Sequence, residues 1–228
     1  MNAMITTIRG LCLVAVIGCA SQGEAALTWN ATAPNVNLPI PDNNPNAGAA
    51  SDIYIAQGDS QLSGMVNPCV ASITSVQFTI TGGWDGDYII VLSHTDGTAA
   101  QSVPLLNTLL GGAAANSGFD NVTLAAGNPD INSAGSYSST AAISGAWAPQ
   151  GGVNFSSFQN VTPTGDWLLY VTDNAAGDQG ILSGWSLNLD VVPEPVTVAL
   201  AIFGGMTGIL AFARSWRAKR LSGGILKC

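Results

Sequence analysis

Short runs of alternating apolar and polar residues, separated by clusters of Gly, Asn, Ser, Thr and Pro, fill the chain from residue 26 to residue 190. Such alternation places the apolar side chains on one face of a strand. Four runs predict clear strands: Ile73–Thr81, Tyr88–Ser93, Trp167–Thr172 and Trp185–Leu189. Three weaker candidates are Asp52–Ala56, Val122–Ala125 and Val153–Phe158, and one short helical turn is expected at Pro104–Leu110. Many short strands between turn residues predict one all-β domain, a jelly-roll or other β-sandwich.

The last two strands of this region carry the strongest apolar pattern. Each places a tryptophan and two aliphatic residues on one face: Trp167, Leu169 and Val171 in the first, and Trp185, Leu187 and Leu189 in the second. We expect Asn174–Gly180, which contains two glycines, to join them as a closing hairpin. Burying these six side chains would contribute on the order of 10 kcal/mol before chain entropy is subtracted. Both tryptophans are therefore predicted to lie in the core.

The N-terminal 1–25 segment has the layout of a secretory signal peptide. Met1–Arg9 carries one positive charge, Leu11–Ala20 is apolar but too short to cross a membrane, and small residues precede a cleavage site before Ala26. A second interpretation is that Val16–Cys19 is a lipobox, which would make its cysteine a lipidated N-terminus. The sequence favours cleavage near residue 25, because Val is a poor first residue for a lipobox.

The C-terminal part of the chain contains a second apolar segment, Val196–Ala213, which has 18 residues and no charge. As a helix it would be about 27 Å long, enough to cross the hydrocarbon core of a bilayer. A basic cluster follows at once and is typical of a stop-transfer signal: Arg214, Arg217, Lys219 and Arg220. A buried core helix is the alternative, but such helices seldom end in a basic cluster. We therefore expect a single transmembrane helix over residues 196–213.

Directly before this segment stands a Pro-Glu-Pro motif made of Pro193, Glu194 and Pro195, which neither a strand nor a helix is expected to continue through. The order Pro-Glu-Pro, apolar helix and basic cluster resembles the PEP-CTERM sorting tail of Gram-negative bacteria over residues 191–220. The resemblance implies a transient membrane anchor that exosortase, a membrane transpeptidase, recognises and removes. Leu221–Cys228 extends further past the basic cluster than such tails usually do. The tail as a whole is assigned to residues 191–228.

Charge is distributed very unevenly along the chain. All six Lys and Arg lie near its ends, whereas residues 26–192 contain twelve Asp and no Lys, Arg or Glu, which gives this region a formal charge of −12. No ion pair to Lys or Arg can form inside the region, so its fold must depend on burial and backbone hydrogen bonds. Nucleic acids and anionic membrane surfaces would repel it. The charge pattern therefore excludes a nucleic-acid-binding protein.

Cysteine and histidine are too scarce for several kinds of site. Cys12 and Cys19 lie in the signal peptide and Cys228 in the tail, which leaves Cys69 without a disulfide partner in the processed protein. His94 is the only histidine, so no catalytic triad and no zinc cluster of His and Cys are expected. We predict that the protein has no catalytic residues and is not an enzyme.

The second half of the domain carries two related motifs. Residues 165–173 read GDWLLYVTD, and residues 177–187 read GDQGILSGWSL. Together with Ile40–Asn43 and Gly86–Leu92 upstream, they resemble the P/Homo B domain, the jelly-roll that follows the catalytic domain of subtilisin-like proprotein convertases. The resemblance spans about residues 36–190 and implies the fold alone, because no catalytic domain is present in this sequence.

Calcium is the one cofactor for which the sequence supplies candidate ligands, namely Asp85, Asp87, Asp173, Asn174 and Asp178. Oxygen ligands in glycine-rich loops suit Ca2+. The alternative is that these residues only cap turns, and the sequence leaves both interpretations open. Asp42–Gly48 begins like an EF-hand loop, but Ile53 occupies the position of the bidentate Glu.

Two classes of function fit these features. The first is an exported, non-catalytic surface or extracellular-matrix protein with an adhesive or structural role in a biofilm exopolysaccharide. The second is a glycan-binding module, in which Trp84, expected in a loop, and Trp147 would stack on sugars. A permanently membrane-anchored accessory domain of a secreted protease is a further alternative. The expected partners are signal peptidase, the Sec export machinery, exosortase and the membrane. The protein is expected to cross the inner membrane and to reach the cell surface or the medium.

Overall fold

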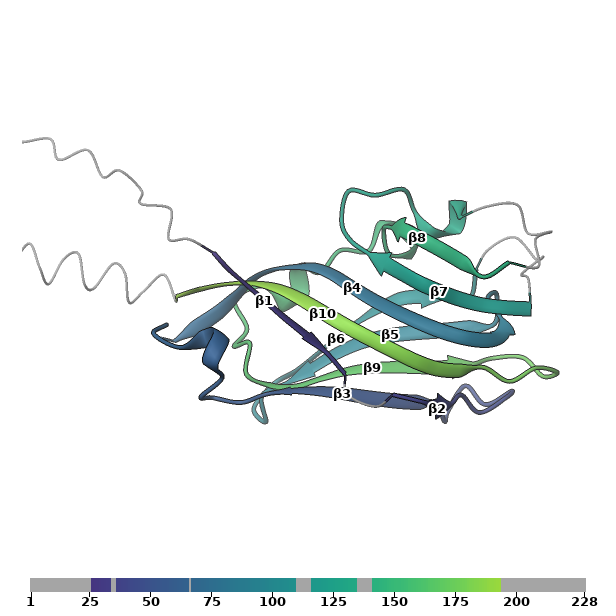
Figure 1. The fold of residues 1–228 in the computed structure, drawn as a ribbon, viewed down its shortest axis with the longest axis horizontal. Helices are drawn as coiled ribbons and strands as arrows, with labels where there is room; N and C mark the ends of the chain where they lie inside the picture. The colour runs from purple at the N-terminus through teal and green to yellow at the C-terminus, as the bar shows by residue number, and fades with distance from the viewer. Residues whose placement is uncertain (1–25, 34–35, 66, 110–115, 135–140, 194–228) are drawn as a thin grey trace, which may run out of the picture.

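The computed structural model describes residues 26–193, apart from 34–35, 66, 110–115 and 135–140 (Figure 1). The predicted signal peptide, Glu194, Pro195, the predicted membrane helix and the basic cluster lie outside the described residues. Within those residues, no helix has the length and apolar character needed to cross a bilayer.

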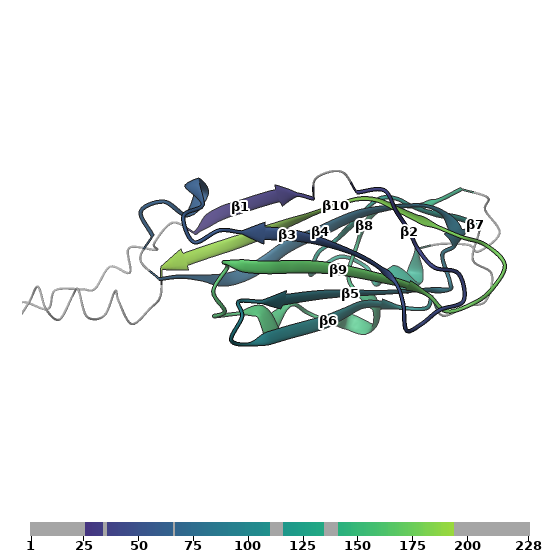
Figure 2. The ribbon, with the colours of Figure 1, turned by 90° about the horizontal axis from the view of Figure 1, so that it is seen from below.

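The described residues form ten strands in two sheets, which lie one over the other in Figures 1 and 2. The first sheet follows the order β1 (Leu27–Thr32), β10 (Ile181–Pro193), β4 (Pro68–Trp84), β7 (Asn116–Leu124) and β8 (Ile143–Trp147), with β2 (Leu38–Pro39) also beside β10. The second sheet follows the order β3 (Ala49–Ile55), β9 (Gly165–Asp173), β5 (Tyr88–Thr95) and β6 (Ala100–Asn107). Four short 3-10 helices lie in the connections: Ser60–Leu62, Ile131–Ser133, Gln150–Gly152 and Ser156–Phe158. The prediction of an all-β sandwich is confirmed.

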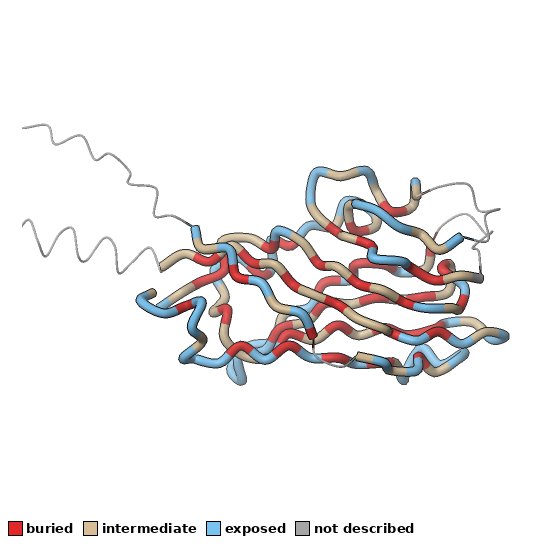
Figure 3. The backbone as a smooth tube through the Cα atoms, in the orientation of Figure 1, coloured by how far each residue is buried: buried red, intermediate tan, exposed pale blue. Residues whose placement is uncertain are grey.

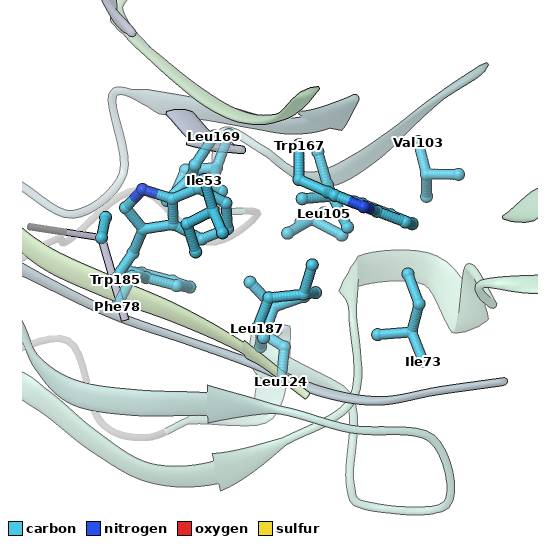
Figure 4. Close-up of a cluster of buried hydrophobic side chains, with 14 of the residues drawn as sticks. Ile53, Ile73, Phe78, Val103, Leu105, Leu124, Trp167, Leu169, Trp185 and Leu187 are labelled. Carbon is cyan, nitrogen blue, oxygen red and sulfur yellow. The ribbon is translucent and has the colours of Figure 1, made fainter. Parts of the chain in front are cut away.

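The core lies between the inner faces of the two sheets, and buried and exposed positions alternate along the strands (Figure 3). Figure 4 shows side chains from both sheets meeting there, with Trp167 and Leu105 on one side and Leu187 and Ile73 on the other. Both predicted core tryptophans, Trp167 and Trp185, are buried. The indole Nε1 of Trp185 also donates a hydrogen bond across the sandwich to the hydroxyl of Ser51 in β3 (2.9 Å).

The prediction that Trp167–Thr172 and Trp185–Leu189 pair with each other as a closing hairpin is wrong. Strand β9 pairs with β3 and β5, whereas β10 pairs with β1, β2 and β4, so Asn174–Gly180 crosses from one sheet to the other. The apolar faces of β9 and β10 therefore face each other across the core instead of lying side by side. Alternation with a period of two determines which face of a strand is buried, but not which strand lies beside it.

Two further local predictions are also wrong. Val153–Phe158 is not a strand, because Asn154 Oδ1 accepts a hydrogen bond from the Ser156 N–H (3.0 Å) and a 3-10 turn buries Phe155 and Phe158. Pro104–Leu110 does not begin with a helical turn, because Pro104 lies in strand β6. That strand is at the edge of its sheet and pairs only with β5, where a missing N–H is tolerated.

The first and last described strands meet at one end of the sandwich. β1 runs antiparallel to β10, with Leu27 opposite Val191, and both termini of the described chain leave from that end in Figure 1. The opposite end is formed by residues 40–44, 85–87 and 174–180, and we refer to it as the loop end. Strand β10 separates the two ends by 13 residues, which corresponds to roughly 40 Å of extended chain.

Candidate functional site

Backbone hydrogen bonds hold the three segments of the loop end together. The N–H of Asn43 donates to the carbonyl of Ala175 (3.1 Å), and the N–H of Asn44 donates to the carbonyl of Asp173 (2.9 Å). The N–H of Asn174 donates to the carbonyl of Asp87 (3.0 Å). Segments separated by more than 40 residues in the sequence are therefore fixed beside one another.

These contacts gather the carboxylates of Asp42, Asp87, Asp173 and Asp178, which we call the aspartate cluster. Burial raises the pKa of Asp87, and the charge of Asp42 raises it further. Burial also raises the pKa of Asp173 and of Asp178; the charges of Asp87 and Asp42 add to both effects, and the charge of Asp173 adds to that on Asp178. Because residues 26–192 contain no Lys or Arg, no basic side chain of the sandwich offsets this repulsion.

Two members of the cluster contain buried carboxylate oxygens without hydrogen-bond partners. Asp173 is fully buried; its Oδ1 accepts from the Ala175 N–H (3.1 Å), whereas its Oδ2 has no partner. Asp178 accepts from the backbone N–H of Trp84, and its Oδ2 also has no partner. Asp42 is exposed and accepts from the Gly177 N–H with both oxygens (3.2 and 3.3 Å). Unpartnered buried acceptors are rare in folded proteins, so these oxygens call for an explanation.

Asp85 lies beside the aspartate cluster and not within it. Its side chain is only 1% exposed and accepts a hydrogen bond from the backbone N–H of Gly118 in β7. Burial raises the pKa of Asp85 to about 7, and the charge of Asp178 adds a smaller effect. Its Oδ1 is a further buried oxygen without a partner. Asn174 is exposed and joins the loop end through its backbone N–H.

The structure thus brings together three of the five candidate calcium ligands, Asp87, Asp173 and Asp178. It adds Asp42, whose charge acts on Asp87, Asp173 and Asp178 and which the sequence did not identify as a candidate ligand. Among the residues that the structure describes, no group of three or more His, Cys, Asp or Glu side chains is arranged to hold a metal ion.

The two candidate glycan-contact tryptophans lie in different places. The prediction that Trp84 lies in a loop is wrong, because this residue is the last of strand β4. Its side chain is 41% exposed, and its backbone adjoins Asp178. Trp147 lies in β8, where it is half-buried and donates its Nε1–H to the Ser144 carbonyl (2.8 Å). Trp84 pairs with the start of β7 and Trp147 with its end, roughly 25 Å apart along the strand. They do not form one platform.

The only histidine is part of the core. His94 is 3% exposed and stacks on Trp167, with ring centroids 4.1 Å apart. Its Nδ1 lies 3.2 Å from the Asp166 carbonyl oxygen and its Nε2 lies 2.9 Å from the Thr162 carbonyl oxygen. Burial lowers the pKa of His94, although these two carbonyls act in the opposite direction. Cys69 is buried in β4, on the other sheet.

Comparisons with known proteins do not assign this chain to a family. No family model matches the chain, and no curated protein matches it. Among solved structures, the chain is similar to a chain in the crystal structure of an Aeromonas sobria serine protease (ASP) in complex with the chaperone ORF2. The identity is 16% and the TM-score is 0.39, over 73% of this chain and 26% of that one, so this chain spans about a quarter of that protein's length. The resemblances to PEP-CTERM tails and to the P/Homo B domain therefore stay predictions from the sequence.

Proposed function

We propose that this chain is an exported, non-catalytic surface or extracellular-matrix protein whose β-sandwich is anchored transiently by its C-terminal tail. The predicted signal peptide over residues 1–25 directs it across the inner membrane through the Sec machinery. The Pro-Glu-Pro motif, the apolar segment 196–213 and the basic cluster hold it there until exosortase removes the tail.

The observation that carries this proposal is the pairing of β1 with β10. Because Leu27 lies opposite Val191, the predicted cleavage site before Ala26 and the sorting motif that starts at Pro193 belong to the same end of the sandwich. A domain held by its tail at that end presents the loop end, with Trp84 and the aspartate cluster, away from the membrane. This arrangement suits a module that meets ligands or matrix polymers outside the cell.

A non-catalytic role is supported by the burial of His94 and Cys69, the two side chains best suited to nucleophilic catalysis. The ring nitrogens of His94 both face backbone carbonyls inside the core, and Cys69 is buried in the other sheet. A general base must reach the proton that it removes from a substrate or nucleophile. In the described part of the chain, His94 is not placed to do so.

Glycan binding at the loop end is a second candidate function, and the exposure of Trp84 favours it. An exposed indole offers an apolar face, and the neighbouring carboxylates offer hydrogen-bond acceptors. We expect Trp84→Ala to reduce retention on exopolysaccharide in a pull-down, with Trp147→Ala as the matched control. Equal retention of both variants and wild type would remove this candidate.

The sorting proposal is tested by fractionating cells that encode an exosortase and express the precursor. We expect the wild-type protein at the cell surface or in the medium, and Glu194→Ala in the inner membrane. Asp190→Asn serves as a control, because it removes a nearby acidic charge but leaves the motif intact. If the wild type and Glu194→Ala both stay in the inner membrane, the chain is permanently anchored and the sorting proposal is wrong.

A further inference from the structure

The two sheets of the described residues have four edges, and the chain itself blocks three of them. A free edge exposes backbone N–H and C=O groups with which another strand can pair, so proteins usually cover or interrupt it. At the β1 edge, the side-chain amide of Gln61 occupies the backbone of Asn30. It accepts from the Asn30 N–H (3.4 Å) and donates to the Asn30 carbonyl (3.2 Å). Strand β2, which lies beside the start of β10, has only two residues, and one is a proline.

The edges at β6 and β8 are blocked in other ways. In β6, Pro104 has no N–H, the pairing with β5 shifts register once, and the Asn107 N–H donates to Gln150 Oε1 (2.6 Å). Strand β8 has only five residues, and Gly145 in its middle has a φ of 92°. Proline, bulges and short irregular strands all protect an edge against pairing with another chain.

Strand β3 (Ala49–Ile55), at the edge of the second sheet in Figure 1, shows none of these features. It has seven residues without proline or glycine, and it pairs with β9 without a register shift. In the part of the chain that the structure describes, β9 is its only backbone hydrogen-bond partner. Every second residue of β3 therefore directs its N–H and C=O groups outward, where nothing described pairs with them. The outer side chains Ala50, Asp52 and Tyr54 are exposed, and that of Tyr54 is 66% exposed.

One unprotected edge, in a fold that protects its other edges, indicates that this edge is used. We propose that β3 pairs antiparallel with the β3 strand of a second copy of this chain. The pairing joins the four-stranded sheets of the two copies into one continuous sheet. The interface is isologous, because both copies contribute the same strand. The proposal goes beyond the function proposed above and does not depend on sorting or on glycan binding.

The side chains of β3 determine the register of this pairing. Asp52 is the only charged residue of the strand. Overlap over the full length of β3 places Asp52 opposite the partner's Asp52, and like charges directly opposite each other destabilise a strand pair. A register shifted by two residues and centred on Ile53 avoids this contact and keeps both faces of the sheet continuous. It places Asp52 opposite the partner's Tyr54 at both ends of the contact, so the edge of β3 is complementary to itself.

The charge distribution of the sandwich favours the antiparallel arrangement. Strand β3 runs from the loop end towards the end where β1 and β10 meet, because it is antiparallel to β9, which ends at Asp173. Antiparallel pairing therefore places the two aspartate clusters at opposite ends of the dimer, whereas parallel pairing would bring them together. Two chains held in one membrane by the proposed tails could not pair in this way, so the dimer belongs to the released protein.

The test is sedimentation equilibrium of the full chain in density-matched detergent micelles over a range of protein concentrations. We expect a reversible equilibrium between monomer and dimer, because one pair of edge strands is a small interface. Tyr54→Asp places a second carboxylate opposite the partner's Asp52 and should weaken dimerisation at least tenfold. Trp84→Asp is the matched control. It introduces the same charge at another exposed aromatic residue, outside β3, and should dimerise like the wild type.

A double variant, Asp52→Lys with Tyr54→Asp, keeps the proposal falsifiable if Tyr54→Asp alone is destabilised. It places a lysine opposite an aspartate at both ends of the contact and should restore dimerisation to at least the wild-type level. Thermal melting of each variant separates loss of pairing from loss of folding. A wild type that stays monomeric at the highest concentration would overturn the proposal and would leave β3 open to an extended segment of another protein. A dimer that Tyr54→Asp does not weaken, or that the double variant does not restore, would overturn it as well, because the contact then lies elsewhere.

Discussion

Asp96 and Asp85 show how strongly the surroundings of one residue type change its chemistry in this molecule. Asp96 is solvated at a turn, and hydrogen bonds from Thr98 and Ala99 lower its pKa to about 2. Asp85 is buried against β7, and the loss of solvation raises its pKa to about 7. Neither behaviour follows from the sequence, where both residues stand beside glycine in a turn-forming segment.

The raised pKa of Asp85 predicts that stability changes with pH. The folded-state pKa of about 7 exceeds the ordinary value of 3.8, so the folded protein keeps a proton that the unfolded chain releases between these pH values. The free energy of unfolding therefore falls as pH rises from about 4 to about 7. Asp85→Asn should reduce this decline and be more stable than the wild type above pH 7, by about 1–3 kcal/mol.

The measurement is chemical denaturation at several pH values in chelator, which excludes any effect of bound calcium. Asp96→Asn is the matched control: its folded-state pKa is lowered, so removing that charge should cost stability above pH 4 instead of adding it. Superimposable pH profiles for the wild type and Asp85→Asn would show that Asp85 does not carry the effect.

Trp185 and Trp84 differ strongly in burial, and we therefore expect their replacement by Ala to cost very different amounts of stability. Trp185→Ala removes a side chain that is 2% exposed and leaves the Ser51 hydroxyl without its donor, so we expect a loss of about 3–5 kcal/mol. Trp84→Ala removes a side chain that is 41% exposed and should cost well under half as much. Urea denaturation of both variants tests this order, and the reverse order would contradict the assignment of core and surface.

At the scale of elements, the sequence predicted strands much better than their partners. Tyr88–Ser93 and Trp167–Thr172 fall inside β5 and β9, because their period-two pattern is regular enough to identify a buried face. Strand β8 (ISGAW) escaped prediction because three of its five residues are small and its pattern has no regular alternation. The pairing of β9 with β3 and β5 was missed for a different reason: it is decided by long-range topology, which no local pattern encodes.

The same limit applies to the candidate site. Asp173 and Asp178 were predictable together, because a single connection joins their strands. Asp42 lies 131 residues before Asp173, and only the hydrogen bonds between residues 40–44 and 173–177 bring it into the cluster. The signal available in the sequence was its position in Ile40–Asn43, a turn-forming segment that the P/Homo B resemblance already included.

The packing of the β4–β5 turn against the start of β10 predicts that a side chain at position 180 destabilises the fold. A Cβ at Gly180 would collide with the hydroxyl of Tyr88, which is buried and donates to the Gly82 carbonyl (3.0 Å). We expect Gly180→Ala to lower the free energy of unfolding by about 1–3 kcal/mol. Gly184→Ala is the control, because open space surrounds that position, and it should change stability by less than about 0.5 kcal/mol. Equal effects in urea denaturation would contradict this packing.

At the scale of the whole molecule, the sandwich is a strongly acidic body with two distinct ends. Apolar burial and hydrogen bonds hold it together, and the formal charge of −12 in residues 26–192 disfavours contact with anionic membrane surfaces. One end brings together the first and last strands, and the other brings together the acidic loops and Trp84. This arrangement of the two ends supports the proposed role outside the cell, in which the chain is held at the end where β1 and β10 meet.

The intact mass of the protein recovered from the envelope and the medium of an exosortase-encoding bacterium tests transient anchoring most directly. Our account predicts a mature chain that begins near Ala26 and lacks the residues beyond about Pro195, because the predicted signal peptide precedes β1 and the predicted sorting tail follows β10. Recovery of chains that retain Val196–Cys228 as the dominant species in every fraction would contradict it and identify a permanent membrane anchor.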